Sequence, residues 1–171
     1  VFAALLVALG ARAEGKPSKA WTDALAEGQE YQRAGDCARA LEKYSEAIAL
    51  RTSPLLRLRM AECQERVGKW VAALATYRLA ANEARSAAEG ELAQRADRAA
   101  ATLGAQIPKL AVRRGPGAAK ANVLLDGVAL DEQSIGEHIS VDPGEHVIEA
   151  LFPGEKSSKV SLTLSPGDRE A

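Results

Sequence analysis

The sequence predicts an α+β chain in two modules, an antiparallel array of helical hairpins followed by a small antiparallel β-sandwich. One observation is a pattern of small and aromatic residues that recurs at an offset of 33 residues. A second is the helical spacing of apolar residues, which extends to about residue 104. The third is a change of period after Ile107-Pro108, where short apolar runs alternate with glycine- and proline-containing turns.

The recurring pattern has matched residues in two consecutive hairpins. Four residue pairs keep the 33-residue offset: Gly35 and Gly68, Ala40 and Ala73, Tyr44 and Tyr77, and Ala47 and Ala80. A period of this length, with small and aromatic residues at fixed positions, is typical of helical-hairpin repeats. Repeats of this kind stack into extended binding surfaces rather than catalytic pockets.

The chain begins with an uncharged apolar run over residues 1–9, followed by Gly10 and by Ala11-Arg12-Ala13. This order is typical of the hydrophobic region and cleavage site of a secretory signal peptide. We therefore expect residues 1–13 to be a signal peptide truncated at its N-terminus, with the mature chain beginning near Glu14. The run is too short to span a bilayer as a helix. The alternatives are a buried core helix and a membrane anchor.

Residues 20–104 are expected to form five helices with chemically defined ends. Gly35-Asp36 separates the first two, because glycine supplies a left-handed C-terminal position and Asp36 caps the next helix. Ser53 is the expected N-cap of the third helix, and Pro54 occupies its first turn. The expected helices cover residues 21–31, 37–48, 54–67, 70–84 and 88–103, the last ending at Gly104.

After residue 108 the apolar runs shorten to strand length, and turns separate them. The expected strands cover residues 110–112, 123–125, 138–141, 146–152 and 160–164. Regularly spaced short strands of this kind indicate a small β-sandwich over residues 109–171. Residues 167–171 are predicted to form a turn before one further strand. Without that strand the module would be incomplete at its C-terminus, and its sheet would keep an open edge for a partner or a second copy.

Small and large residues occupy corresponding positions in the two hairpins. The small ones are Gly28, Ala40 and Ala47 in the first and Ala61, Ala73 and Ala80 in the second, and the large ones are Tyr31, Tyr44 and Tyr77. In this pattern residues 21–87 resemble the tetratricopeptide repeat (TPR) family. Gln64 departs from it, since the first hairpin has Tyr31 there. The fifth helix shows no clear third repeat and is expected to act as a capping helix.

The TPR resemblance implies a concave groove lined by the first helix of each hairpin. Transferred by position, that groove would carry Leu25, Gln29, Gln32 and Arg33, and Leu58, Glu62, Glu65 and Arg66. Hydrogen-bonding and charged groups of this kind suit an extended peptide. The residues expected to contact a partner are Gln29, Gln32, Arg33, Glu62, Glu65 and Arg66.

Two turn-and-strand motifs characterise the second module. Asp142-Pro143-Gly144-Glu145-His146 leads into a strand that ends at Pro153-Gly154, and Val123-Leu124-Leu125 leads into Asp126-Gly127. In these motifs residues 109–167 resemble the PEGA domain, a small bacterial β-sandwich. PEGA domains are mostly found in extracytoplasmic bacterial proteins, often joined to other modules. Neither resemblance implies a catalytic role.

Composition and motifs exclude several function classes. The chain has 22 Lys+Arg against 23 Asp+Glu and a net charge of −1, whereas a nucleic-acid partner would normally need a basic patch. The sequence has no nucleophile–base set and no phosphate-binding glycine loop. We expect His138 and His146 to be half-exposed strand residues rather than metal ligands. No cofactor is expected.

Cys37 and Cys63 are the only cysteines, on two helices that are expected to pack antiparallel. In an oxidising compartment they are a candidate disulfide. Simple pairing about Thr52 places Cys37 opposite position 67, about one helical turn from Cys63, and a bridge demands a short Cα distance. The alternative is two small buried thiols at helix contacts.

Taken together, the sequence predicts an exported bacterial protein, in the periplasm or at the cell surface. We expect a non-enzymatic scaffold that binds another protein through the concave face of its helices, with no stable membrane span once the signal peptide is removed. The alternative is a cell-wall or carbohydrate-binding accessory protein that uses the PEGA-like module. Phe152 is the only aromatic residue of 105–171, which disfavours this alternative because sugars usually stack on exposed Trp or Tyr.

Overall fold

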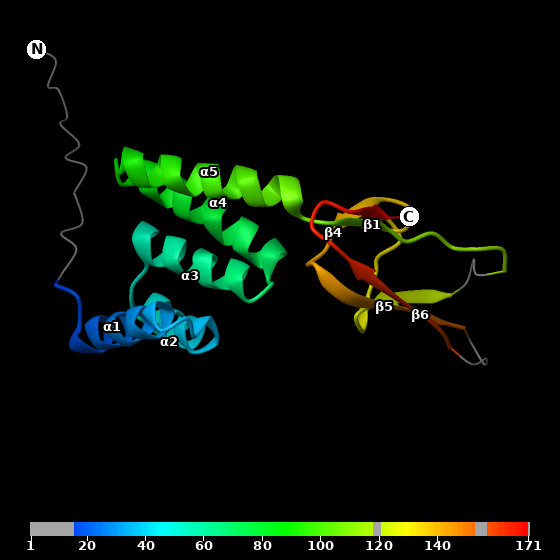
Figure 1. Cartoon of the computed structure of the whole chain (residues 1–171), viewed down its shortest axis with the longest axis horizontal. Helices are drawn as coiled ribbons and strands as arrows, with labels where there is room; N and C mark the ends of the chain where they lie inside the picture. The colour runs from blue at the N-terminus through cyan, green and yellow to red at the C-terminus, as the bar shows by residue number, and fades with distance from the viewer. Residues whose placement is uncertain (1–15, 118–120, 153–156, 171) are drawn as a thin grey trace, which may run out of the picture.

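The chain folds into a helical part followed by a smaller β part (Figure 1). The structure, a computed structural model, describes residues 16–117, 121–152 and 157–170. The helices of these ranges are α1 (Lys19–Arg33), α2 (Cys37–Leu50), α3 (Pro54–Arg66), α4 (Trp70–Ser86) and α5 (Gly90–Gln106). The expected signal peptide, residues 1–13, lies outside the described residues.

Local chemistry defines the ends of the first helices, as predicted. The side chain of Asp36 accepts a hydrogen bond from the N–H of Arg39 at the start of α2. Ser53 caps α3 in the same way, with a proline in the first turn of that helix. Gly35 has a φ of 81°, the left-handed conformation that ends α1. These ends produce two hairpins, α1–α2 and α3–α4.

A glycine sets the distance between the helices of the first hairpin. Gly28 on α1 is buried, and a Cβ atom at this position would lie 2.6 Å from two ring atoms of Tyr44 on α2. The Tyr44 ring is itself fully buried, so it has no free space into which to move. In the second hairpin, Ala61 and Tyr77 lie 33 residues further along and are also buried.

The helices bury two neighbouring apolar clusters. The first joins α1, α2 and α3 and contains Ala24, Cys37, Ala40, Tyr44, Ala47, Leu56 and Cys63. The second joins α3, α4 and α5 and contains Leu58, Ala61, Ala73, Tyr77, Ala80, Ala81, Ala96, Ala100, Leu103 and Ile107. Because α3 contributes to both clusters, it connects the first hairpin to α4 and α5.

The fifth helix extends beyond its predicted end at residue 103 and includes Gly104. A glycine inside a helix costs only about 1 kcal/mol relative to alanine, which the contacts of α5 with α4 overcome. Pro108 is the effective terminator, because the residue before a proline avoids the helical conformation. Ile107 accordingly has φ −60° and ψ 123°, an extended backbone.

The β part consists of short strands in two small sheets. The strands are β1 (Lys109–Ala111), β2 (Asn122–Leu125), β3 (Val128–Ala129), β4 (His138–Ser140), β5 (Gly144–Leu151), β6 (Ser158–Leu164) and β7 (Arg169–Glu170). One sheet has the order β4-β1-β7 and the other β3-β2-β5-β6. Leu110, Val123 and Leu164 belong to one buried cluster, so both sheets share a core.

Five of these strands lie where the sequence predicts them. β3 was missed, since two residues give no alternation to detect. β7 lies within residues 167–171, where the sequence predicted only a turn before a further strand. It pairs with β1 in parallel, whereas the other pairs are antiparallel. The parallel pair arises because the chain crosses from β6, in one sheet, to the open side of β1 in the other.

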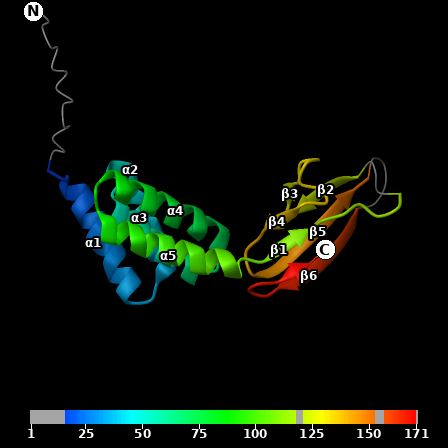
Figure 2. The same cartoon turned by 90° about the horizontal axis from the view of Figure 1, so that it is seen from above.

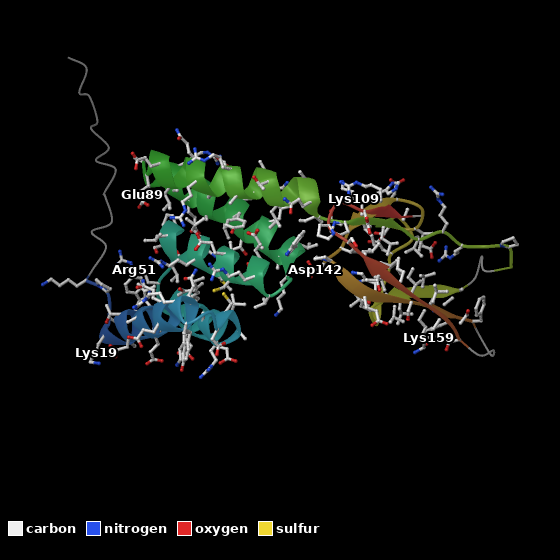
Figure 3. The ribbon with its side chains drawn as sticks, viewed as in Figure 1. Lys19, Arg51, Glu89, Lys109, Asp142 and Lys159 are labelled. Carbon is white, nitrogen blue, oxygen red and sulfur yellow. The ribbon has the colours of Figure 1, made fainter. Side chains whose placement is uncertain are left out.

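The helical and β parts lie end to end, with α5 running directly into β1 (Figure 2). Asp142, in the loop between β4 and β5, lies at this junction (Figure 3). Its Oδ1 accepts a 2.7 Å hydrogen bond from the N–H of Val71, in the first turn of α4. Because Lys69, the N-cap residue of α4, offers no side-chain cap, Asp142 supplies one from 71 residues away.

His146 holds the Asp142 loop against the sheet. Its Nδ1 lies 2.7 Å from Oδ2 of Asp126, and its Nε2 lies 2.6 Å from the carbonyl oxygen of Asp142. Only a protonated imidazole donates from both nitrogens. Burial lowers the pKa of His146, but the hydrogen bonds to these two oxygens outweigh burial and raise it above its ordinary value of 6.5.

The prediction of half-exposed histidines is wrong for both. His146 is buried at 7 % exposure, because strand alternation places it on the side of β5 that faces the core, opposite Leu162. His138 is exposed on β4. The two rings therefore lie in different environments on different sheets.

Replacing Gly28 with alanine should destabilise the helical part, because the new Cβ would lie 2.6 Å from the Tyr44 ring. We expect the free energy of unfolding to fall by about 1–2 kcal/mol, since overpacking outweighs the helix propensity of alanine. In the matched control, Gly104→Ala, the Cβ would lie 3.6 Å from Leu74, and stability should rise by roughly 0.5–1 kcal/mol. Urea denaturation followed by circular dichroism measures both, and equal effects would contradict the close packing at Gly28.

The bonds of His146 should make stability depend on pH. A folded pKa above the unfolded value stabilises the fold fully below about pH 6.5, and this stabilisation is lost as the pH rises through the folded pKa. His146→Gln should therefore cost roughly 1.5–3 kcal/mol in mildly acidic buffer and less in alkaline buffer.

Urea denaturation across this pH range checks the expectation. The control is His138→Gln, which removes the other histidine and leaves the contacts of His146 in place. The proposed role of His146 is wrong if the wild-type chain and His146→Gln differ by the same free energy at every pH.

Candidate functional site

The six residues expected to contact a partner lie on α1 and α3. Gln29, Gln32, Glu62 and Glu65 are partly exposed, and Arg33 and Arg66 are exposed. Leu58, which the same reasoning placed in the groove, is instead buried in the core at 1 % exposure. The reason is that α3 packs between the first hairpin and α4–α5, so it buries more of its surface than α1 does.

A row of hydrogen bonds connects α1, α3 and α5 on this side. The hydroxyl of Tyr44 donates to Oε1 of Gln32 at 2.5 Å, and Nε2 of Gln32 donates to Oε2 of Glu62 at 3.1 Å. The other carboxylate oxygen of Glu62 pairs with the guanidinium of Arg95 on α5. We call the surface that carries these side chains, together with Gln29, Arg33, Glu65 and Arg66, the α1/α3/α5 face.

The second hairpin repeats the tyrosine contact. The hydroxyl of Tyr77 donates to Oε2 of Glu65 at 2.8 Å, 33 residues after the equivalent bond from Tyr44 to Gln32. Burial raises the pKa of Tyr44 to about 12. Burial, and then the bond to Glu65, raise the pKa of Tyr77 well above its ordinary value. Both hydroxyls therefore remain protonated donors at neutral pH and fix the orientation of their acceptors.

Sequence reasoning missed Arg95, because the fifth helix was expected only to act as a cap. The 33-residue offset contained the signal: Gln29, Glu62 and Arg95 lie one repeat apart. The same offset relates Tyr44 to Tyr77. It does not predict the acceptors of their hydroxyl groups, because these acceptors depend on how the two helices of each hairpin pack. A third step of the repeat gives Arg95 the position equivalent to Glu62, but their pairing depends on how α5 packs beside α3.

The α1/α3/α5 face is hollowed. An open hollow of about 460 Å³ is lined by Glu62, Glu65, Arg66, Trp70 and Tyr77. A second, of about 780 Å³, extends along the first turns of α5 and includes Arg95 and Arg98. The Glu62–Arg95 ion pair connects the residues of one hollow to those of the other. Side chains of both charges, with aromatic groups, suit a polar peptide segment better than a small apolar ligand.

Cys37 and Cys63 lie in the same apolar cluster and are both free, buried thiols. Burial, and then a hydrogen bond with Cys37, raise the pKa of Cys63 to about 12. The thiolate is the reactive form of cysteine, so Cys63 is a poor nucleophile at neutral pH. The two thiols are neighbours and unbridged in this structure, and the disulfide between them stays a prediction.

Across residues 16–117, 121–152 and 157–170, no group of three or more His, Cys, Asp or Glu residues is arranged to hold a metal ion. In the same ranges every helix is too short or too polar to cross a membrane. Comparison of the chain with protein-family models, with curated proteins and with solved structures finds no match. Function is therefore inferred from the side chains and their geometry.

A chain exported into an oxidising compartment should contain the Cys37–Cys63 disulfide. Its intact mass, measured without reductant, should be lower by two hydrogens than that of the reduced chain. Closing a loop of this length should stabilise the oxidised form by about 3 kcal/mol, a gain that Cys37→Ser would remove. If both thiols of the exported protein react with iodoacetamide in denaturant without prior reduction, the disulfide prediction is wrong.

Proposed function

We propose that this chain is an exported bacterial scaffold protein, with a TPR-like helical array that binds an extended segment of a partner protein on its α1/α3/α5 face. The observation that carries the proposal is the row of bonds from Tyr44 through Gln32 and Glu62 to Arg95. This row holds each of the polar side chains that it joins, on α1, α3 and α5, in a defined conformation. Fixed side chains lose little conformational entropy on binding, which favours association with a flexible segment.

The hollows beside this row support a peptide as the ligand. Glu65 and Arg66 offer an acceptor and a donor at the same hollow, as an extended backbone with mixed side chains would need. Trp70, which is partly exposed, adds aromatic surface at this hollow, and aromatic contacts often dominate binding energy. Arg33 and Arg66 are exposed on α1 and α3 and would contact the partner from the rim.

The β part is proposed to be a PEGA-like sandwich that holds the helical array at a fixed angle in the periplasm or at the cell surface. The Asp142 cap on α4 supports this structural role, because it joins the two parts directly. The proposed role is non-enzymatic. The raised pKa of Cys63 supports that view. Cys63 is the more deeply buried of the two cysteines, and at neutral pH its thiol stays protonated and is therefore a poor nucleophile.

A photo-crosslinking amino acid at position 66 should capture the partner from an envelope fraction. Arg78, exposed on the adjacent α4, provides the control position. We expect one adduct from position 66 and none from position 78, because only the former lies on the α1/α3/α5 face. Mass spectrometry of the adduct identifies the partner.

With the partner identified, replacing both Arg33 and Arg66 with alanine should weaken its binding about tenfold, or about 1.4 kcal/mol. Arg78→Ala should leave the affinity unchanged. Titration calorimetry measures both. The proposal fails if the double variant binds the partner as tightly as the wild type. Binding of purified cell wall by both the wild type and the double variant would instead support the carbohydrate-binding alternative.

A further inference from the structure

Among the described strands, β6 is the longest that lies at the edge of a sheet. In the order β3-β2-β5-β6 it pairs with β5 on one side, and within the described ranges no strand pairs with its other side. β7, the strand that follows β6 in the chain, joins the other sheet and leaves this edge open. Six of the seven residues of β6 keep at least part of their surface exposed. An open edge carries unpaired N–H and C=O groups that can bind another strand.

β6 lacks the features that usually protect such an edge. It contains no proline, and its register with β5 runs without a bulge from Ser158 to Leu164. Lys159 is its only charged residue, and the Nζ of Lys159 is paired 3.2 Å from Glu149 on the neighbouring strand. The charge is therefore directed back across the sheet and not toward an incoming strand. A regular, weakly charged edge of this kind is a template on which another strand can pair.

The edge also exposes apolar surface. Val160 is 60 % exposed, and by strand alternation it lies on the same face as Leu162 and the buried Leu164. The core between the two sheets buries Leu164 and contacts the partly buried Leu162, so Val160 is the member of this row that it leaves uncovered. A strand added beside β6 would cover Val160 if it placed an apolar residue opposite.

We propose that a second copy of this chain pairs antiparallel with β6, about a two-fold axis at Ser161. In this register all seven residues of β6 find a partner: Ser158 faces Leu164, Lys159 faces Thr163, Val160 faces Leu162, and Ser161 faces Ser161 of the other copy. The pairing is self-complementary, as a two-fold interface must be. No two like charges face each other, and each Val160 is covered by a leucine.

The geometry of the whole chain permits this pairing. Lys159 lies at the end of the β part that faces away from the helices (Figure 3), and the helical part lies end to end with the β part (Figure 2). In the antiparallel register Leu164 of the second copy lies beside Ser158 of the first, so the helical parts of the two copies lie at opposite ends of the dimer. The inference does not depend on the proposed function, but a dimer would present two α1/α3/α5 faces and bind a repetitive partner with higher avidity.

A charge-swap experiment at the two-fold axis tests the proposal on the full chain. Ser161 is exposed, and in the proposed register two Ser161 side chains lie opposite each other. The wild-type chain should sediment as a dimer with twice the chain mass of 18.0 kDa. Ser161→Lys alone and Ser161→Glu alone should each dissociate at roughly tenfold higher concentration, because like charges then face each other.

An equimolar mixture of Ser161→Lys and Ser161→Glu should restore the dimer, since unlike charges then face each other. This restoration separates charge repulsion from misfolding. The control is Ser140→Lys, an exposed serine on β4 in the other sheet, which should leave the dimer unchanged. A monomeric wild type, or a dimer that neither Ser161 variant weakens, overturns the proposal, as does a mixture that behaves like the single variants.

Discussion

The contact between Gly28 and Tyr44 is the constraint on which the helical part depends. Because Gly28 has no side chain, the Tyr44 ring lies directly against α1, at a distance that no Cβ atom would tolerate. That position lets the Tyr44 hydroxyl reach Gln32 on the exposed side of the same helix. Gln32 in turn orients Glu62, and Glu62 pairs with Arg95. A packing requirement in the core thus determines the arrangement of polar groups at the surface.

A second set of contacts connects the helical part to the β part. His146 bridges Asp126 and the backbone of Asp142, and the Asp142 side chain caps α4 at Val71. The burial of His146 matters because a buried imidazole must satisfy both ring nitrogens. Its protonation therefore affects the loop that contacts the helices, and not only the sheet to which it belongs. The junction depends on a titrating group as well as on the covalent link between α5 and β1.

The two parts offer surfaces of different chemistry. The α1/α3/α5 face carries fixed side chains of both charges around open hollows, which suit recognition of a particular sequence. The β6 edge carries backbone groups and a short apolar row, which suit pairing with a strand of matching pattern. The proposed partner binding and the proposed self-association therefore involve different residues.

The sequence by itself determined the features that depend on neighbouring residues. Asp36 and Ser53 cap the helices that follow them, and the turns separate the strands, because each involves only a few adjacent backbone groups. The resemblance to the TPR family placed the expected contact residues on the first helix of each hairpin, and those six residues lie on α1 and α3. Tertiary structure alone decided the burial of His146, the pairing of Arg95 with Glu62, and the capping of α4 by Asp142. Each brings together segments far apart in the chain, and their geometry is set by how whole helices and sheets pack.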